Sequence, residues 1–199
     1  MKAVMPDVPP DILQRRKRTG ADRWDEMWEG VLHILPTPNR VQQDMEAELE
    51  TWLRLHWARP LGNKVYHQIN LASPGGWPDN YRIPDLVLLT PDRFEIDRNE
   101  YFEGPPTVVV EIRSPGDESH EKMPFYAKLG VPEVWIIDRD TKAPQVFVLH
   151  DGDYREQSPH DDGWLESPAT GIEVCVRPGQ KLGIRLAGDA STEQLLPED

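Results

Sequence analysis

The spacing of hydrophobic residues changes along the chain from a helical period to the period of strands. Between Val41 and Trp57, apolar residues recur at steps of three and four. This spacing predicts an amphipathic helix that ends at about Arg59, before Pro60. Downstream, short apolar runs predict strands near residues 65–71, 83–89, 107–113, 134–138, 145–149, 172–176 and 182–186.

Two further elements flank these runs. Residues 24–35 have a turn signal at Glu29-Gly30 between apolar residues, which predicts a hairpin or a short strand that ends at the Pro36-Thr37-Pro38 segment. A second helix is expected between Ser114 and Gly130, with Gly130 as its C-terminal stop. Its inward-facing residues are expected to be Met123, Tyr126 and Ala127.

The order of these elements predicts one α/β (α+β) domain over residues 1–199. A chain of 199 residues that is 38% hydrophobic has enough apolar material for one core of ordinary size. Residues 1–22 are expected to form a proline-rich arm and a short helix from about Asp11 to Arg18. Residues 187–199 are expected to be a disordered tail.

Charge restricts the partners that we expect. The chain has 22 Lys and Arg against 35 Asp and Glu, a formal net charge of −13. A field of this sign repels phosphate backbones, so nucleic-acid binding would need local compensation. The one dense basic cluster is Arg15, Arg16, Lys17 and Arg18, which we interpret as a solvated helix face.

The compartment is also constrained. No window approaches the ~18 consecutive apolar residues of a membrane span, and the first ten residues lack the apolar core of a signal peptide. The single Cys175 permits neither an internal disulfide nor a cysteine zinc site. We therefore expect a cytoplasmic protein without a membrane partner, in which any metal has oxygen or nitrogen ligands.

Two carboxylates interrupt the apolar runs. Asp85 lies in IPDLVLL and Glu111 in TVVVEIR. A buried, unpaired carboxylate costs several kcal/mol, so a compensating cation is expected. If the two strands are neighbours, the carboxylates converge and provide the oxygen ligands that Mg²⁺ or Mn²⁺ prefers. Alternatively, both residues lie at strand ends and pair with Arg82, Arg113 or backbone amides.

A resemblance favours the metal site. Pro84-Asp85, followed 26 residues later by Glu111-Ile112-Arg113, resembles the PD-(D/E)XK nuclease signature. Residues 108–138 (VVVEIRSPGDESHEKMPFYAKLGVPEVWIID) resemble the Uma-type family of putative restriction endonucleases, and weaker likeness extends over about residues 24–150. The resemblance implies a restriction-endonuclease-like core, with a mixed β-sheet flanked by helices and a divalent metal held by Asp85 and Glu111.

The same resemblance assigns the cationic residues. The family commonly lacks the lysine two residues after the glutamate and uses a lysine from the following helix, which here corresponds to Lys122. Arg113 occupies the original lysine position. Because arginine does not lose its proton in proteins, Arg113 suits phosphate binding better than proton transfer. Lys122 is therefore the first candidate for the catalytic cation and Arg113 the second.

Further site residues are expected from the helix that begins near Val41 and from the predicted turn. The family often has a His-Gln pair where this chain has Gln42 and Gln43, which removes an acid–base role at that position. Related nucleases often add a carboxylate from this helix. Glu48 and Glu29 are therefore candidate extra ligands, with surface salt bridges as the alternative.

Other hydrolase classes lack support. The six histidines include no HExxH pattern, and the Gly75-Gly76 pair is not followed by GK[ST]. We therefore expect a Mg²⁺-dependent DNA endonuclease that acts as a homodimer, since duplex cleavage usually needs two sites. One alternative is a catalytically degenerate relative that serves as a binding or assembly module. Another is a metal-dependent hydrolase of a small phosphorylated substrate.

Overall fold

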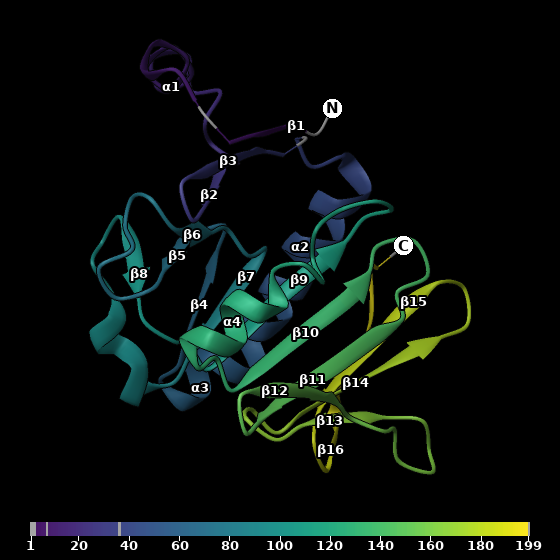
Figure 1. Cartoon of the computed structure of the whole chain (residues 1–199). Coiled ribbons are helices and arrows are strands. Elements are labelled where there is room, and N and C mark those ends of the chain that lie inside the picture. The colour runs from purple at the N-terminus through teal and green to yellow at the C-terminus, as the bar shows by residue number, and fades with distance from the viewer. Residues whose placement is uncertain (1–2, 7, 36, 199) are drawn as a thin grey trace.

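The computed structural model describes residues 3–6, 8–35 and 37–198, and a central mixed sheet organises them (Figure 1). In spatial order its strands are β12, β11, β10, β9, β7 and β4. Strands β9 and β10 are parallel and joined through helix α4 (Met123–Leu129), whereas β7 runs antiparallel to β9. The bounds are β4 (Lys64–His67), β7 (Leu86–Leu89), β9 (Val108–Arg113), β10 (Glu133–Asp138), β11 (Pro144–His150) and β12 (Asp153–Glu156).

A second sheet has the order β1-β3-β2-β6-β5-β8. Of the two alternatives predicted for residues 24–35, the structure has the hairpin, with Glu29 and Gly30 at positive φ in the turn. Pro36, predicted to end the hairpin, lies outside the described residues. The bounds are β1 (Ala3–Met5), β2 (Glu26–Trp28), β3 (Val31–Ile34), β5 (Asn70–Ala72), β6 (Tyr81–Arg82) and β8 (Tyr101–Glu103).

The predicted strand over residues 65–71 is two strands in two different sheets. β4 ends at His67 and β5 begins at Asn70. Between them Gln68 has φ 48°, a left-handed conformation that a continuous strand does not contain. The chain therefore leaves the central sheet at this point and enters the second sheet.

The third sheet has the order β13-β14-β15-β16, and it corrects the prediction of a disordered tail. Residues 189–196 form β16 and pair with β15. Leu196 is fully buried, and Trp52 Nε1 donates to the Thr192 carbonyl at 2.9 Å. The bounds are β13 (Leu165–Ser167), β14 (Ile172–Arg177), β15 (Lys181–Leu186) and β16 (Asp189–Leu196).

The helices differ from the predictions mainly in their ends. The helix near Val41 is confirmed. It continues as a π-helical segment, passes Pro60 and ends before Gly62, which is left-handed. Proline is tolerated here because it stands in the first turn of α3. The bounds are α1 (Pro10–Thr19), α2 (Arg40–Trp52), η1 (Leu53–Ala58), α3 (Arg59–Leu61), the 3₁₀ segment η2 (Pro91–Ile96) and α4 (Met123–Leu129).

The helix predicted over 114–130 begins only at Met123 and ends at Gly130 as predicted. Turns occupy residues 114–122, because the Asp117 carboxylate accepts the backbone N–H groups of Ser114 and Ser119. Such local acceptors compete with helical hydrogen bonds. No helix among the described residues is long and apolar enough to cross a membrane.

Alternating side chains of the central strands form two hydrophobic clusters, one on each face of the sheet. Val110 and Ile112 of β9 lie in the cluster beneath α2, η1 and the third sheet. Val109, one residue away, lies in the cluster beneath α4, with Tyr126. The central strands are therefore covered on both faces.

Candidate active site

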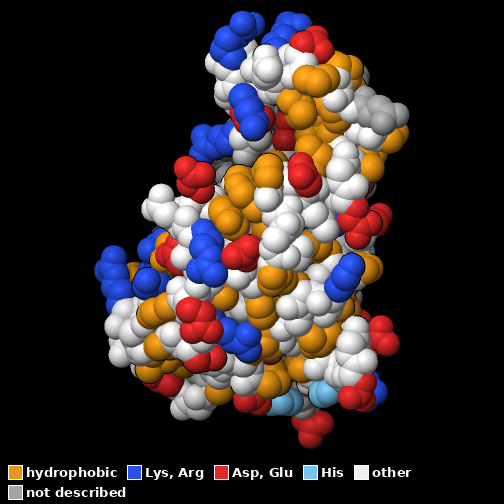
Figure 2. All heavy atoms as spheres, turned by 60° about the vertical axis from the view of Figure 1, so that its left-hand side comes forward, with side chains coloured by type: hydrophobic (Ala, Val, Ile, Leu, Met, Phe, Trp, Pro, Cys, Tyr) orange, Lys and Arg blue, Asp and Glu red, His pale blue; other side chains and the backbone are white. Residues whose placement is uncertain are grey.

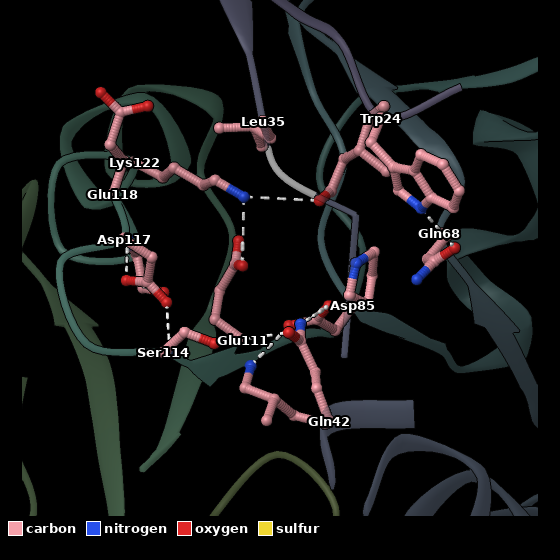
Figure 3. A pocket seen from close by; sticks show the side chains of 14 residues that line it. Trp24, Leu35, Gln42, Gln68, Asp85, Glu111, Ser114, Asp117, Glu118 and Lys122 are labelled. Carbon is pink, nitrogen blue, oxygen red and sulfur yellow. Dashed lines mark hydrogen bonds and ion pairs between the residues drawn. The ribbon is translucent and has the colours of Figure 1, made fainter. Parts of the chain in front are cut away.

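Pairing between β7 and β9 brings the two predicted carboxylates together. The antiparallel register pairs Leu86 with Val110. Continued by one residue, this register places Asp85 opposite Glu111 and on the same face of the sheet. Both side chains line one cavity of about 100 Å³ near the C-terminal end of β9 (Figure 3). The sequence prediction that these residues converge is confirmed in geometry.

Asp85 is held by two hydrogen-bond donors. The Ile112 backbone N–H donates to Oδ2 at 2.6 Å, and Gln42 Nε2, from the first turn of α2, donates to Oδ1 at 3.2 Å. Burial raises the pKa of Asp85 to about 6, against the opposing effects of these donors and of Lys122. The two donors thus orient the carboxylate, but together with Lys122 they offset only part of the cost of burying its negative charge.

Glu111 is more deeply buried, with 3% of its surface exposed. Its Oε2 accepts from Lys122 Nζ at 3.1 Å, and its Oε1 accepts from the Tyr126 hydroxyl at 2.5 Å. Burial raises the pKa of Glu111 to about 8, although the Lys122 charge opposes this shift. Both donors come from the crossover between β9 and β10, so the parallel pair itself positions this site.

The ammonium group of Lys122 lies within hydrogen-bonding distance of three acceptors. They are Glu26 Oε1 at 2.8 Å, Glu111 Oε2 at 3.1 Å and the Ile83 carbonyl at 3.4 Å. Burial alone would lower the lysine pKa, but the carboxylates of Glu111 and Glu26 outweigh it and hold the pKa above its usual range. Lys122 is therefore a fixed positive charge in this site.

Glu26 is a site residue that the sequence reasoning missed. It lies on β2 and is fully buried. Its carboxylate accepts from Lys122, from Trp28 Nε1 at 2.6 Å and from the Ile83 backbone N–H at 2.9 Å. The available signal was a carboxylate inside the predicted hairpin strand, the same signal that identified Asp85 and Glu111.

Three predicted candidates lie away from the cavity. Arg113 faces Asp138 of β10, its register partner, at 3.7 Å. Glu29 is exposed in the hairpin turn. Glu48 is half-buried, and its side chain accepts the backbone N–H of Glu198 near the C-terminus. The structure therefore does not bring Glu29 and Glu48 to this cavity: Glu29 lies in the exposed turn, and Glu48 lies on the face of α2 near the C-terminus.

The carboxylate of α2 that lies near Asp85 is Glu46, a second residue that was missed. It is 4% exposed, and its Oε1 has no hydrogen-bond partner among the described residues. Its Oε2 accepts from Gln68 Nε2 at 3.2 Å, and Gln68 also lines the cavity of Asp85. Burial, followed by the charges of Asp85 and Glu50, raises the pKa of Glu46 to about 8.

The donor set fits a hard divalent cation. The buried carboxylates of Glu26 and Glu111 pair with one ammonium group, and the half-buried carboxylate of Asp85 lies in the same site, so the cluster carries excess negative charge when ionised. Carboxylate oxygens are the ligands that Mg²⁺ and Mn²⁺ prefer, and Mg²⁺ usually keeps several waters beside one or two carboxylates. Within the described ranges, no group of three His, Cys, Asp or Glu is arranged to hold a metal. Asp85 and Glu111 are the carboxylates opposite each other in this cavity, and they could supply two such oxygen ligands.

Comparisons with known proteins agree with this fold. Residues 11–177 match the model of the Uma2 family, described as "Putative restriction endonuclease". The structure is similar to the crystal structure of a putative nuclease belonging to DUF820 from Anabaena variabilis ATCC 29413. That likeness has a TM-score of 0.58 and 16% sequence identity, and covers 73% of this chain and 82% of that chain. No curated protein matches this chain.

Proposed function

Because the chain belongs to the Uma2 family of putative restriction endonucleases, we propose that it is a metal-dependent endonuclease that hydrolyses phosphodiester bonds of DNA. The observation that supports this most is the convergence of Asp85 and Glu111 in one cavity, with a single buried lysine to balance them. A site built only for stability would gain nothing from burying this excess of negative charge.

In this proposal Asp85 and Glu111 hold Mg²⁺ or Mn²⁺. Such an ion supplies Lewis-acid polarisation of a phosphoryl oxygen and a water of lowered pKa. Gln42 orients Asp85 through its amide, and the Ile112 N–H fixes the second oxygen. Lys122 holds Glu111 and places a positive charge where phosphate charge would develop. Its raised pKa suits this electrostatic role rather than that of a general base.

Asp85→Asn tests the proposal, because it removes one ligand charge and preserves the side-chain shape. We expect Mn²⁺ to raise the melting temperature of the wild-type protein and to support nicking of plasmid DNA, and we expect the variant to lose both responses. Asp92→Asn, which removes an exposed carboxylate from η2, is the matched control. Nicking by Asp85→Asn at the wild-type rate would overturn the assignment.

A second function is favoured by a specific observation. Both oxygens of Glu111 are already paired within the protein, and Arg113 stands at the position of the motif lysine. A degenerate relative that serves as a binding or assembly module would have this arrangement. Such a protein would show no thermal shift with Mn²⁺, so the same titration separates the two functions.

Cleavage of both strands of a duplex requires two sites, and each chain has one cavity with the Asp85 and Glu111 pair. We therefore propose a homodimer as the acting form. Light scattering on the purified protein, with and without a DNA duplex, measures the mass directly. A monomer in both conditions would restrict the activity to nicking one strand.

A further inference from the structure

Helix α1 carries the densest group of positive charges in the chain, and none of its residues is buried. Residues 10–23 contain five Lys or Arg against two Asp. The rest of the chain contains 17 basic and 33 acidic residues. The sign of the local charge on this helix is thus opposite to that of the remaining molecule.

Three of these cations are available to a partner. Arg15, Lys17 and Arg18 are exposed and make no ion pair with any described residue. Arg16 is different, because its Nε and Nη2 both donate to the Asp25 carboxylate and Nη2 also donates to the Ala21 carbonyl. One arginine therefore anchors the helix, and its neighbours face solvent.

The anchored helix is attached to the frame of the candidate active site. Strand β1, before the helix, pairs with β3, and Asp25, after the helix, directly precedes β2. The same hairpin supplies Glu26, which binds Lys122, and His33, which lies 3.0 Å from Glu118. Figure 1 shows α1 projecting beyond this hairpin, and Figure 2 shows Lys and Arg side chains gathered on the projecting end.

We propose that α1 is a contact surface for the phosphate backbone of duplex DNA, an inference that rests on the proposed nuclease function. A polyanion is repelled by the acidic remainder of the molecule at long range. Screening confines that repulsion to about 8–10 Å at physiological salt. A basic helix that stands away from the body therefore binds phosphates where the repulsion is weakest, and its anchors hold it relative to Glu111.

The test compares two triple variants that make the same change in net charge. Arg15→Gln, Lys17→Gln and Arg18→Gln remove the exposed cations of α1. Arg59→Gln, Lys128→Gln and Arg155→Gln remove three exposed cations from other elements. Binding of a fluorescent DNA duplex is followed by anisotropy in EDTA over a range of salt concentrations, so cleavage does not enter the measurement.

We expect the α1 variant to bind at least about tenfold more weakly at about 0.1 M salt, with a salt slope reduced by about 2 to 3. The control variant should change the affinity less than about twofold. Equal binding by both variants, or no duplex binding by the wild type, would overturn the inference. If light scattering showed a changed mass for the α1 variant alone, the helix would be a self-association surface, and this result would also overturn the inference.

Failure of the two proposals is distinguishable. If the wild type binds DNA through α1 but no variant or wild type cleaves it, the helix inference stands and the nuclease proposal fails. If the wild type cleaves DNA and the α1 variant binds and cleaves equally well, the nuclease proposal stands and the helix inference fails.

Discussion

At the scale of single residues, Glu46 shows how the acidic site affects stability. Its carboxylate is buried and faces the charges of Asp85 and of Glu50 on its own helix, with His67 Nδ1 of β4 3.8 Å away. Burial raises its pKa to about 8. A carboxyl group whose folded pKa is raised stabilises the fold below its unfolded pKa of about 4.3, and this contribution is lost as pH rises through the folded value.

The variant Glu46→Gln should therefore gain stability over the wild type as pH rises from about 5 to 9. The two proteins should be similar near pH 5, and the variant should be more stable by on the order of 3 kcal/mol near pH 9. Urea unfolding at several pH values measures the difference. Glu48→Gln, which makes the same substitution at a half-buried position of the same helix, is the matched control for the change in net charge. A constant difference for Glu46→Gln would contradict the pKa shift.

The site residues that the sequence predicted share one property, which is a carboxylate inside an apolar run. This property identified Asp85 and Glu111 because burial was implied by their neighbours. Glu26 escaped because β2 has only three residues, and its burial depends on Lys122, which lies far away in the sequence. Glu46 is four residues from Gln42 and three from Leu49, so helical spacing already placed it on the inner face.

At the scale of elements, β16 shows that amino-acid composition alone does not predict whether a polar segment is ordered. Residues 189–196 are polar enough to predict disorder, yet they pair with β15 and end at a fully buried leucine. Hydrogen bonds to β15 pair the backbone N–H and C=O groups of these residues. The local composition of the segment carries no information about such a partner strand. The turns over 114–122 are a similar case, since the Asp117 side chain rather than hydrophobic spacing decides their conformation.

Substitution of the two adjacent leucines at the end of β16 tests its contribution. Leu196→Ala should destabilise the protein by about 3 kcal/mol, because it leaves a cavity in the cluster beneath the third sheet. Leu195→Ala is the matched control, since Leu195 is 43% exposed, and it should cost less than about 0.5 kcal/mol. Chemical denaturation measures both values. Equal, small effects would show that β16 is not docked in solution.

At the scale of the whole molecule, the two hydrophobic clusters share the central strands. Val109 belongs to one cluster and Val110 to the other, so neither layer can detach without uncovering β9. We therefore expect urea to unfold the chain in one transition, with coincident midpoints by far-UV circular dichroism and by tryptophan fluorescence. Separate midpoints would divide the chain into two folding units and would contradict the prediction of a single domain.

The shared sheet also has a consequence for synthesis of the protein on the ribosome. Every side chain that binds Asp85 or Glu111 has been made once translation passes Tyr126. The opposite face of β9, which α2 and η1 cover in part, is covered completely only when β16 has been made, 70 residues later. At about 5–20 residues per second, the nascent chain carries a complete set of site residues on an incompletely covered sheet for about 4–14 s. A nascent chain that has not yet reached β16 therefore leaves part of the hydrophobic cluster on that face of the sheet exposed to solvent, although its site residues are already complete.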